Sequence, residues 1–297
     1  MFEIIKPGTK IDFMGKSKLF FLISGIIVLL SLVIIFTKGF NLGIDFAGGS
    51  VIQVRFDNPP SLDVLRENIK KLNLGDVVIQ NFGDEREVLI RVEKTDNDLN
   101  AVANDVKSAL SNSFKNNNFI VERVEQVGPQ VGSELQKKAT MAVIYALIGI
   151  LIYVAVRFEF IFSIGAVLAL FHDVIITLGV FSITSREINL PIVAAVLTIV
   201  GYSLNDTIVV YDRIRERLKG SASKVSLLNL INQSINETLS RTLLTSFTTF
   251  LAVLALYVFG SEIIKNFSFA LLIGIIVGTY SSIGIASSFV YSIKRDK

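Results

Sequence analysis

The stretch LPIVAAVLTIVGYSLNDTIVVYDRIRER, Leu190–Arg217, combines a long apolar run with a carboxylate inside it. Apolar residues continue past Asp206, and basic residues begin only at Arg213. A helix rises about 1.5 Å per residue, so about 20 apolar residues cross a hydrocarbon core roughly 30 Å thick. The stretch therefore predicts a membrane-spanning helix over 190–212, with Asp206 about 10 Å above its basic end.

The whole composition is typical of a membrane protein, because hydrophobic residues make up 51% of the 297 residues and charged residues only 19%. The first apolar segment follows Lys16 and Lys18 as a signal peptide would, but no small-residue cleavage site follows it, so we expect it to be retained. Six segments are long and apolar enough to span: 19–36, 139–156, 161–183, 190–212, 236–260 and 266–290.

The residue types needed for common catalytic and metal sites are scarce. The chain has no cysteine, which excludes thiolate metal sites and cysteine nucleophiles, and it has one histidine. One histidine with dispersed carboxylates supplies no compact ligand set for a transition metal. DFAGGS lacks the lysine of a phosphate-binding loop, and no nucleophile with a positioned base is visible. We therefore expect no metal, no cofactor and no enzymatic activity.

Lysine and arginine are concentrated at one set of helix ends. They precede the first span, occur at Arg157 and between Arg213 and Lys224, and follow the last span, whereas the opposite short loops hold only Arg186 and Lys265. Cytoplasmic loops carry this excess of positive residues. We predict that the N-terminus (1–18), the loop 213–235 and the C-terminus (291–297) are cytoplasmic.

The cytoplasmic loop 213–235 has a pattern of its own. Apolar residues recur at helical spacing within SKVSLLNLINQSI. The pattern predicts an amphipathic helix lying on the membrane surface, and a solvated loop is the alternative.

A polar segment, 37–138, separates the first two spans, and this topology places it outside the cytoplasm. SVIQVRFD, DVVIQNF, EVLIRVE and FIVERVEQV have strand patterns, whereas SLDVLRENIKKL and NDLNAVANDVKSALSNSF have helical spacing. The order βαββαβ predicts a ferredoxin-like sheet with two helices on one face. Its acidic and basic residues nearly cancel, so nothing indicates nucleic-acid binding. The predicted fold class is a polytopic α-helical membrane protein with one extracytoplasmic α+β domain.

Ionisable residues inside three predicted spans are candidate functional residues. Each costs about 2.5–3.5 kcal/mol at the bilayer centre unless it is partnered. The third span contains His172 and Asp173, the fourth Asp206 and the fifth Arg241. The fourth and fifth spans are antiparallel, so Asp206 and Arg241 lie at comparable depth and can meet. A carboxylate is ionised beside a guanidinium and tends to take up a proton without it, so we predict a proton path here.

Neighbouring polar residues extend this predicted path. Asn205 precedes Asp206, and Thr245 lies one turn beyond Arg241 and begins a hydroxyl stripe. Such a stripe supports a chain of water molecules, or simply the packing of helices. The pair of His172 and Asp173 belongs to the candidate set, although adjacent side chains on a helix point about 100° apart.

Structural roles are the alternatives for these residues. Arg241 has Glu237 one turn earlier on its own helix, and Asp206 has Tyr202 one turn earlier and Asn205 beside it. The histidine of the third span is equally explained as a buried core residue that the adjacent aspartate orients.

Six motifs together resemble one family of membrane proteins. They occur in order along nearly the whole chain: DFAGG (45–49), VGPQVGSEL (127–135), RFE (157–159), ALFHDV (169–174), VGYSLNDTIVVYDRIRER (200–217) and NQSINETLSRTLLTS (232–246). In these motifs the sequence is similar to the SecD/SecF family of protein-export membrane proteins, a branch of the RND superfamily of proton-driven transporters. Arg217 stands where many relatives have asparagine, beyond the predicted membrane boundary.

The resemblance implies a function and a set of partners. It implies six spans with a large extracytoplasmic domain after the first, and a SecD subunit that supplies a second, related six-helix half. It implies work beside the SecYEG channel, where the proton motive force assists late translocation and release of an unfolded polypeptide across the cytoplasmic membrane. The carboxylate of the NDT motif is Asp206 and the arginine of SRT is Arg241, and the resemblance assigns both to the proton path.

Two other functions remain open at this point. The chain could be half of another RND-type exporter, for lipids or small molecules, or a binding and scaffold subunit without transport. A second large loop with a substrate pocket would favour an exporter, and this sequence has only one large loop.

Overall fold

A computed structural model describes residues 9–72, 74, 75, 77–92, 99–220 and 226–295 of the chain. The chain divides into two compact units. One is the membrane bundle, formed by Met1–Asn41 with Ala142–Lys297, and the other is an α+β domain, Leu42–Met141.

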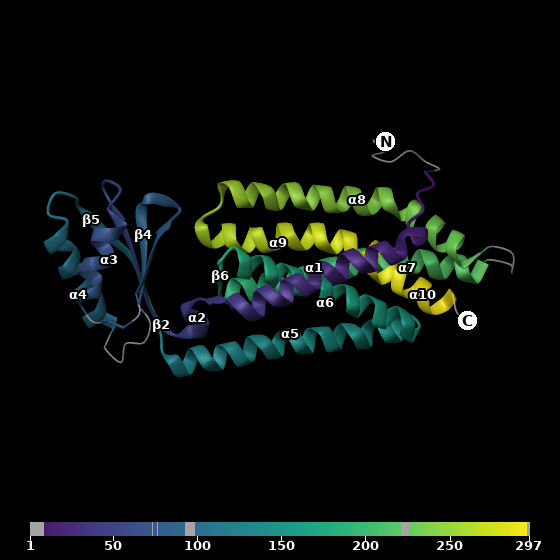
Figure 1. Cartoon of the computed structure of the whole chain (residues 1–297), viewed down its shortest axis with the longest axis horizontal. Helices are drawn as coiled ribbons and strands as arrows, with labels where there is room; N and C mark the ends of the chain where they lie inside the picture. The colour runs from purple at the N-terminus through teal and green to yellow at the C-terminus, as the bar shows by residue number, and fades with distance from the viewer. Residues whose placement is uncertain (1–8, 73, 76, 93–98, 221–225, 296–297) are drawn as a thin grey trace. The chain divides into compact units, whose positions relative to one another are not determined.

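The described residues include six helices long and apolar enough to cross a membrane, as predicted. Figure 1 shows these helices running alongside one another. A 3-10 turn, η1 (Met14–Lys16), precedes the first, and two-residue strands β1 (Asn41–Leu42) and β6 (Glu187–Ile188) lie in connections. The spans are α1 (Ser17–Lys38), α5 (Pro129–Arg157), α6 (Phe160–Ile183), α7 (Leu190–Gly220), α8 (Leu227–Phe259), and α9 (Glu262–Ser281) continued by η2 (Ser282–Ser287) and α10 (Ser288–Arg295).

The prediction of a separate surface helix within 213–235 was wrong. Helix α7 continues to Gly220 and α8 already begins at Leu227, so most of this loop extends the two spans. Ser226 caps α8 by accepting a hydrogen bond from the Asn229 amide, 3.4 Å away. The amphipathic spacing belongs to the first turns of a long helix. Residues 221–225 lie outside the described part of the chain.

Several other helix ends also differ from the predicted bounds. Helix α5 begins at Pro129, ten residues before the predicted start at 139, because proline is favoured in the first turn and polar residues continue the helix. Polarity marks where a helix leaves the hydrocarbon core. It does not mark where the helix ends.

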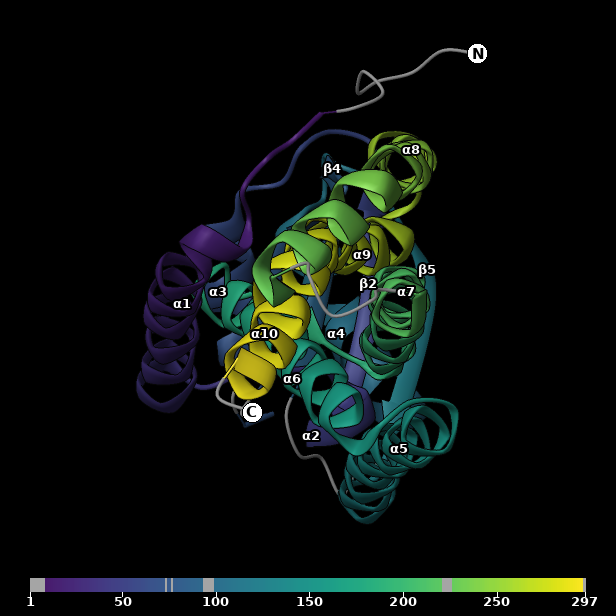
Figure 2. The ribbon, with the colours of Figure 1, turned by 90° about the vertical axis from the view of Figure 1, so that its right-hand side faces the viewer.

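Helices α6, α7 and α9 form the centre of the bundle. Buried residues make up 61%, 50% and 56% of the most apolar 18-residue window in α6, α7 and α9. In α1, α5 and α8 they make up 11%, 6% and 17% of the same window. Figure 2 shows α1, α5 and α8 on different sides of α9 and α6. The central helices are therefore positioned by this chain, whereas the peripheral helices leave most of their surface for lipid or another protein.

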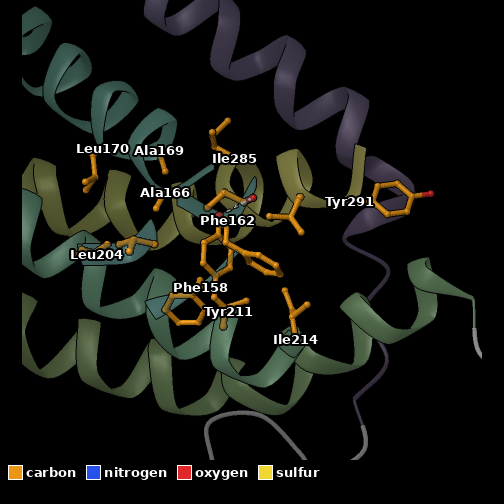
Figure 3. Packing of buried hydrophobic residues seen from close by; sticks show 14 of the residues in the cluster. Phe158, Phe162, Ala166, Ala169, Leu170, Leu204, Tyr211, Ile214, Ile285 and Tyr291 are labelled. Atoms are coloured by element: carbon orange, nitrogen blue, oxygen red, sulfur yellow. Dashed lines mark hydrogen bonds between the residues drawn. The ribbon is translucent and has the colours of Figure 1, made fainter. Parts of the chain in front are cut away.

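Aromatic packing holds the ends of α6 and α7 together. The rings of Phe162 and Tyr211 meet edge to face at 4.9 Å, and Phe158 lies 6.0 Å from Tyr211 (Figure 3). Such pairs add about 0.5–1.5 kcal/mol beyond burial. Lipid tails are as apolar as these side chains, so close packing is the main force that holds the bundle together.

Two glycines allow α9 to approach α7 closely. A Cβ atom at Gly274 would overlap Ile199, and one at Gly278 would lie 3.0 Å from the Cβ of Ser203. Both positions are buried. The glycines thus bring backbone and small side chains of the two helices together, which places Ser203 within reach of groups on α9.

The last span contains a widened turn. The segment η2 is a π-helix, a conformation that is rare and often occurs at functional sites. Two side-chain hydroxyls bond to its carbonyls: Ser287 Oγ donates to Ser282 O at 2.9 Å, and the Tyr211 hydroxyl donates to Ala286 O at 3.1 Å. These bonds compensate for the disrupted hydrogen bonding of a regular α-helix.

The α+β domain has the predicted ferredoxin-like arrangement. Its elements are β2 (Gly49–Phe56), α3 (Leu62–Lys70), β3 (Val77–Phe82), β4 (Asp84–Val92), α4 (Leu99–Ser113) and β5 (Phe119–Val127). The sheet order is β3-β4-β2-β5, and every pairing is antiparallel. Residues of both helices pack into one core with the inward residues of the sheet, such as Leu65, Val106 and Ile52.

The DFAGG and VGPQVGSEL motifs meet at the base of this domain. Gly48 and Gly49 follow the short helix α2 (Ile44–Ala47) with φ of 76° and 111°, which strongly favour glycine. A Cβ at Gly48 would lie 2.9 Å from Pro129 Cα, and one at Gly132 would lie 3.0 Å from Gly48 N. The glycines therefore permit a direct contact between two backbones.

Candidate functional site

Asp206 lies on α7 and is almost completely buried, with 3% of its surface exposed. Its Oδ2 accepts a hydrogen bond from Ser246 Oγ of α8 at 3.2 Å. Thr279 of α9 in turn donates to Ser246 Oγ at 2.8 Å. A short line of polar groups therefore crosses three helices at this depth, and among the described residues one neutral hydroxyl, that of Ser246, donates to the carboxylate.

Arg241 lies near Asp206 but does not bond to it. Among the described residues no hydrogen bond or ion pair joins the two side chains, and Arg241 is exposed on α8. The alternative partner Glu237 is occupied by Arg213, at 2.5 Å, and by Arg217. The direct pair of Asp206 and Arg241 is therefore not formed in this conformation, and the proton path through them stays a prediction.

The buried stripe of α8 explains this arrangement. Leu239, Thr242 and Ser246 are buried at spacings of three and four residues, so they share the face that packs in the bundle. Arg241 and Thr245 lie on the exposed side of the same helix.

The other predicted path residues near Asp206 also lie on exposed surface. Asn205 is exposed on α7. The Thr245 hydroxyl donates to backbone carbonyls of its own helix, those of Arg241 at 3.0 Å and Thr242 at 2.9 Å. The hydroxyl stripe is therefore present on α8, but it contacts its own backbone and not Asp206. The alternative partner Tyr202 makes no hydrogen bond through its buried hydroxyl among the described residues.

His172 and Asp173 form a second buried polar group, on α6. Asp173 Oδ1 lies 2.9 Å from His172 Nδ1, while Oδ2 accepts bonds from Ser203 Oγ of α7 at 2.5 Å and Ser281 Oγ of α9 at 2.8 Å. Asp173 is fully buried and His172 is 6% exposed. This carboxylate therefore links all three central helices.

Four hydroxyl residues around the two carboxylates were not predicted: three bond to a carboxylate directly, and Thr279 bonds to the hydroxyl of Ser246. They are Ser203, Ser246, Thr279 and Ser281. Serine and threonine are frequent in membrane helices, so composition alone does not single them out. The periodicity of α8 carried a usable signal, because Ser246 lies four residues after Thr242 and seven after Leu239, on the apolar side.

Opposite charges pair at the helix ends where the sequence concentrates basic residues. Arg157 of α5 lies 3.3 Å from Asp212 of α7, and Lys294 of α10 bonds at 2.6 Å to Glu159, the residue before α6. These ion pairs are largely exposed, and each adds at most about 1 kcal/mol. They fix the ends of helices and lie apart from the buried site.

The N-terminal segment is attached to α8 at this end of the bundle. Asn232 accepts hydrogen bonds from the amides of Phe13 and Met14 and donates to Asp12 at 2.7 Å. The Gly15 amide, and then Asn232, hold the pKa of Asp12 below its ordinary value. The chain before α1 is thus fastened to the first turns of α8.

These features define a multi-pass membrane protein with ionisable groups inside its helical bundle, a class that includes ion-coupled transporters. The family described as "Protein export membrane protein SecD/SecF, C-terminal" matches residues 105–296, and the "SecD/SecF GG Motif" matches residues 33–60. The second match contains Gly48 and Gly49. The chain belongs to the SecD/SecF family of protein-export membrane proteins.

Individual relatives agree with this membership. The chain is 62% identical to a "Protein translocase subunit SecF" of Calditerrivibrio nitroreducens over 98% of its own length and 97% of the relative. It is 50% identical to the same subunit of Magnetococcus marinus, over 97% and 93%. The crystal structure of SecDF, a translocon-associated membrane protein, from Thermus thermophilus matches with a TM-score of 0.87 and 37% identity over 97% of this chain. This chain spans 39% of that longer chain.

Proposed function

We propose that this chain is an accessory subunit of the Sec protein-export machinery. Together with a SecD half it would use the proton motive force to assist late translocation and release of proteins across the cytoplasmic membrane. Relatives named as SecF over nearly the whole chain and the match to SecDF support this role. The basic helix ends support cytoplasmic N- and C-termini. The role requires no hydrolytic chemistry of this chain.

The observation that carries the proposal is the incomplete environment of Asp206. An ionised carboxylate buried without a cation is strongly unfavourable, and a single hydroxyl bond does not compensate for it. The side chain is stabilised either by taking up a proton or by approach of the Arg241 guanidinium. Alternation between these two states would couple proton movement to a displacement of α8 against α7.

The exposed faces of α7 and α8 fit a protein partner. Arg241, Asn205 and Thr245 are exposed on membrane-spanning helices, where lipid would solvate them poorly. Ala194, Thr198 and Gly201 continue the exposed face of α7 with small side chains, which favour close helix packing. We assign this face to the SecD half, because the related SecDF chain is long enough to contain this chain and a second half.

The remaining partners follow from the same proposal. The related structure is described as translocon-associated, so we assign the SecYEG channel as the neighbour of this subunit. The extracytoplasmic α+β domain would face the emerging unfolded polypeptide on the far side of the membrane.

A conservative substitution tests the role of Asp206. We expect Asp206→Asn to abolish the stimulation of late-stage export by the proton motive force in membrane vesicles, because the amide keeps the shape but cannot exchange a proton. Asp212→Asn is the matched control, since Asp212 lies on the same helix and forms an exposed ion pair with Arg157. The control should retain stimulated export.

Two results would contradict the proposal. Normal stimulation in Asp206→Asn would remove the proposed proton carrier. Full export after replacement of all six spans by an inert membrane anchor would favour a scaffold role for the extracytoplasmic domain alone.

A further inference from the structure

We propose that His172 and Asp173 form a second proton-binding site in the membrane bundle, coupled to Asp206 through residues 278–281 of α9. The inference deepens the proposed function and rests on it, because a second site gives the same bundle a second position at which a proton is held.

The Asp173 carboxylate is built to carry negative charge. It receives hydrogen bonds from Ser203 and Ser281 on one oxygen and contacts His172 through the other. Three donors from three helical positions stabilise an anion well.

The charge balance of this site depends on a proton. Asp173 accepts hydrogen bonds from Ser203 of α7 and Ser281 of α9. The His172 ring lies 5.9 Å from the ring of Tyr280 of α9, whose hydroxyl bonds to Ser24 of α1. Among these contacts of the described residues, Tyr280 is the only titratable side chain, and Asp206 lies one turn from Ser203. Among the described residues, the only ion pair of Asp173 is with His172. One bound proton makes the pair neutral, and without it a net negative charge stays buried, which is unfavourable.

The bound proton has a defined atom, Nε2 of His172. When bound, it leaves the imidazole protonated on both nitrogens, with Nδ1–H donating to Asp173 Oδ1. When Nε2 releases it, a neutral imidazole still donates from Nδ1, and the two serines hold the carboxylate. Nε2 is buried and has no hydrogen-bond partner among the described residues. A proton can therefore bind to or leave Nε2 without breaking the contacts of Asp173 with Nδ1, Ser203 and Ser281.

The α9 segment connects this site to Asp206. Ser281 bonds to Asp173, while Thr279, two residues earlier, bonds to the Ser246 hydroxyl that donates to Asp206. On α7, Ser203 bonds to Asp173 and lies three residues, or about one turn, before Asp206. The same helix therefore carries a contact of the second site and the carboxylate of the first. A shift of α9 or α7 that follows protonation at one carboxylate thus changes the donors at the other.

The single histidine of the chain makes the proposal directly measurable. We would label the full chain with 15N-histidine, place it in lipid nanodiscs and record 15N spectra as a function of pH. The chain has one histidine, so the imidazole signals report only His172. We expect the signals to change from the imidazolium to the neutral form as pH is raised across the range in which the chain stays folded. A histidine that keeps one protonation state over this range would overturn the proposal, because a purely structural histidine needs no exchange.

The coupling has its own test. Asp206→Asn should shift the midpoint of the His172 titration by about 0.7 pH unit or more, a fivefold change in proton affinity that is at the low end of typical coupling. Asp212→Asn should leave the midpoint unchanged. Equal midpoints in wild type and Asp206→Asn would overturn the coupling. Misfolding of the variant would be recognised in the same spectra, because the 15N chemical shift of Nδ1 would lose the value typical of a hydrogen-bonded nitrogen.

The outcome is separable from that of the proposed function. A non-titrating His172 together with loss of stimulated export in Asp206→Asn would overturn only the second site. A titrating His172 together with normal stimulation in that variant would overturn the proposed function and leave the second site standing.

Discussion

Asp173 and Asp206 are both buried carboxylates on membrane-spanning helices, but this chain surrounds them to different degrees. Asp173 has partners on its own helix, on α7 and on α9, whereas Asp206 has one hydroxyl partner and a nearby arginine that points to the surface. The first site is complete within the chain. The second lies beside exposed polar and small residues, so its chemistry depends on a partner or on a movement.

The largest difference should be in stability. Asp173→Ala leaves three buried donors without their acceptor, and we expect it to lower the free energy of unfolding by about 3–5 kcal/mol. Asp206→Ala removes one hydrogen bond and should lower it by about 1 kcal/mol. Thermal unfolding of both variants in the same detergent measures the difference. Equal losses would show that the two sites are equally complete.

Association with the partner half should depend on the incomplete site. Arg241→Ala should weaken binding to a SecD half by about 2 kcal/mol, roughly 30-fold, because buried arginines are common energetic centres of interfaces. The isolated chain should keep its stability within about 0.5 kcal/mol, since the Arg241 side chain is exposed and forms no hydrogen bond or ion pair with the described residues. Fluorescence energy transfer between labelled halves in vesicles checks the first expectation. Unchanged association would remove Arg241 from the interface.

The packing around Asp173 gives a smaller effect. Gly278→Ala would place a methyl group 3.0–3.1 Å from Ser203 and should cost about 1–2 kcal/mol of stability. Gly201→Ala is the matched control, because nothing lies within 4 Å of the added Cβ and alanine favours a helix by about 0.5–1 kcal/mol. Melting temperatures of the two variants should therefore move in opposite directions. A destabilised Gly201→Ala chain would mean that the α7 face is already covered.

The smallest predicted effect concerns the attachment of the N-terminal segment, through Asp12, to α8, the helix that carries Arg241. The pKa of Asp12 is lowered in the folded chain, so its contacts stabilise the attachment above the ordinary carboxyl pKa and are lost as pH falls through the lowered value. A spin label on Ile11→Cys, in a chain without other cysteines, should become more mobile in acid. In an Asp12→Asn background the mobility should not depend on pH. A label equally mobile at every pH in the parent chain would contradict this.

Much of the fold follows from local sequence patterns. The six apolar segments and the βαββαβ order depend on hydrophobic periodicity and length, which are local properties, and both were predicted correctly. The prediction of a separate surface helix within 213–235 was wrong because long membrane helices extend beyond the bilayer, where their surfaces are polar. Charge alone could not distinguish such extensions from a separate helix.

The site was predictable only in part. The depth of Asp206 and Arg241 follows from residue counting, and the structure places them near each other. Which hydroxyl contacts Asp206 depends on the rotation of α8 about its axis: the predicted stripe that begins at Thr245 lies on the exposed side, and Ser246, one residue or about 100° further, makes the bond. The contacts of Asp173 join residues 30 and 108 positions apart, which no local pattern relates.

The π-helical turn η2 has a mechanical consequence for the last span. Each residue advances a helix by about 100°, so one extra residue in a turn rotates everything beyond it by a comparable angle. Ser281 can therefore face Asp173 while Val290, beyond the turn, still faces the hydrophobic core at the other end. The last span therefore consists of two helical segments, α9 and α10, separated by η2. A rotation of α9 that moves Thr279 and Ser281 need not rotate the basic C-terminal segment α10 by the same angle.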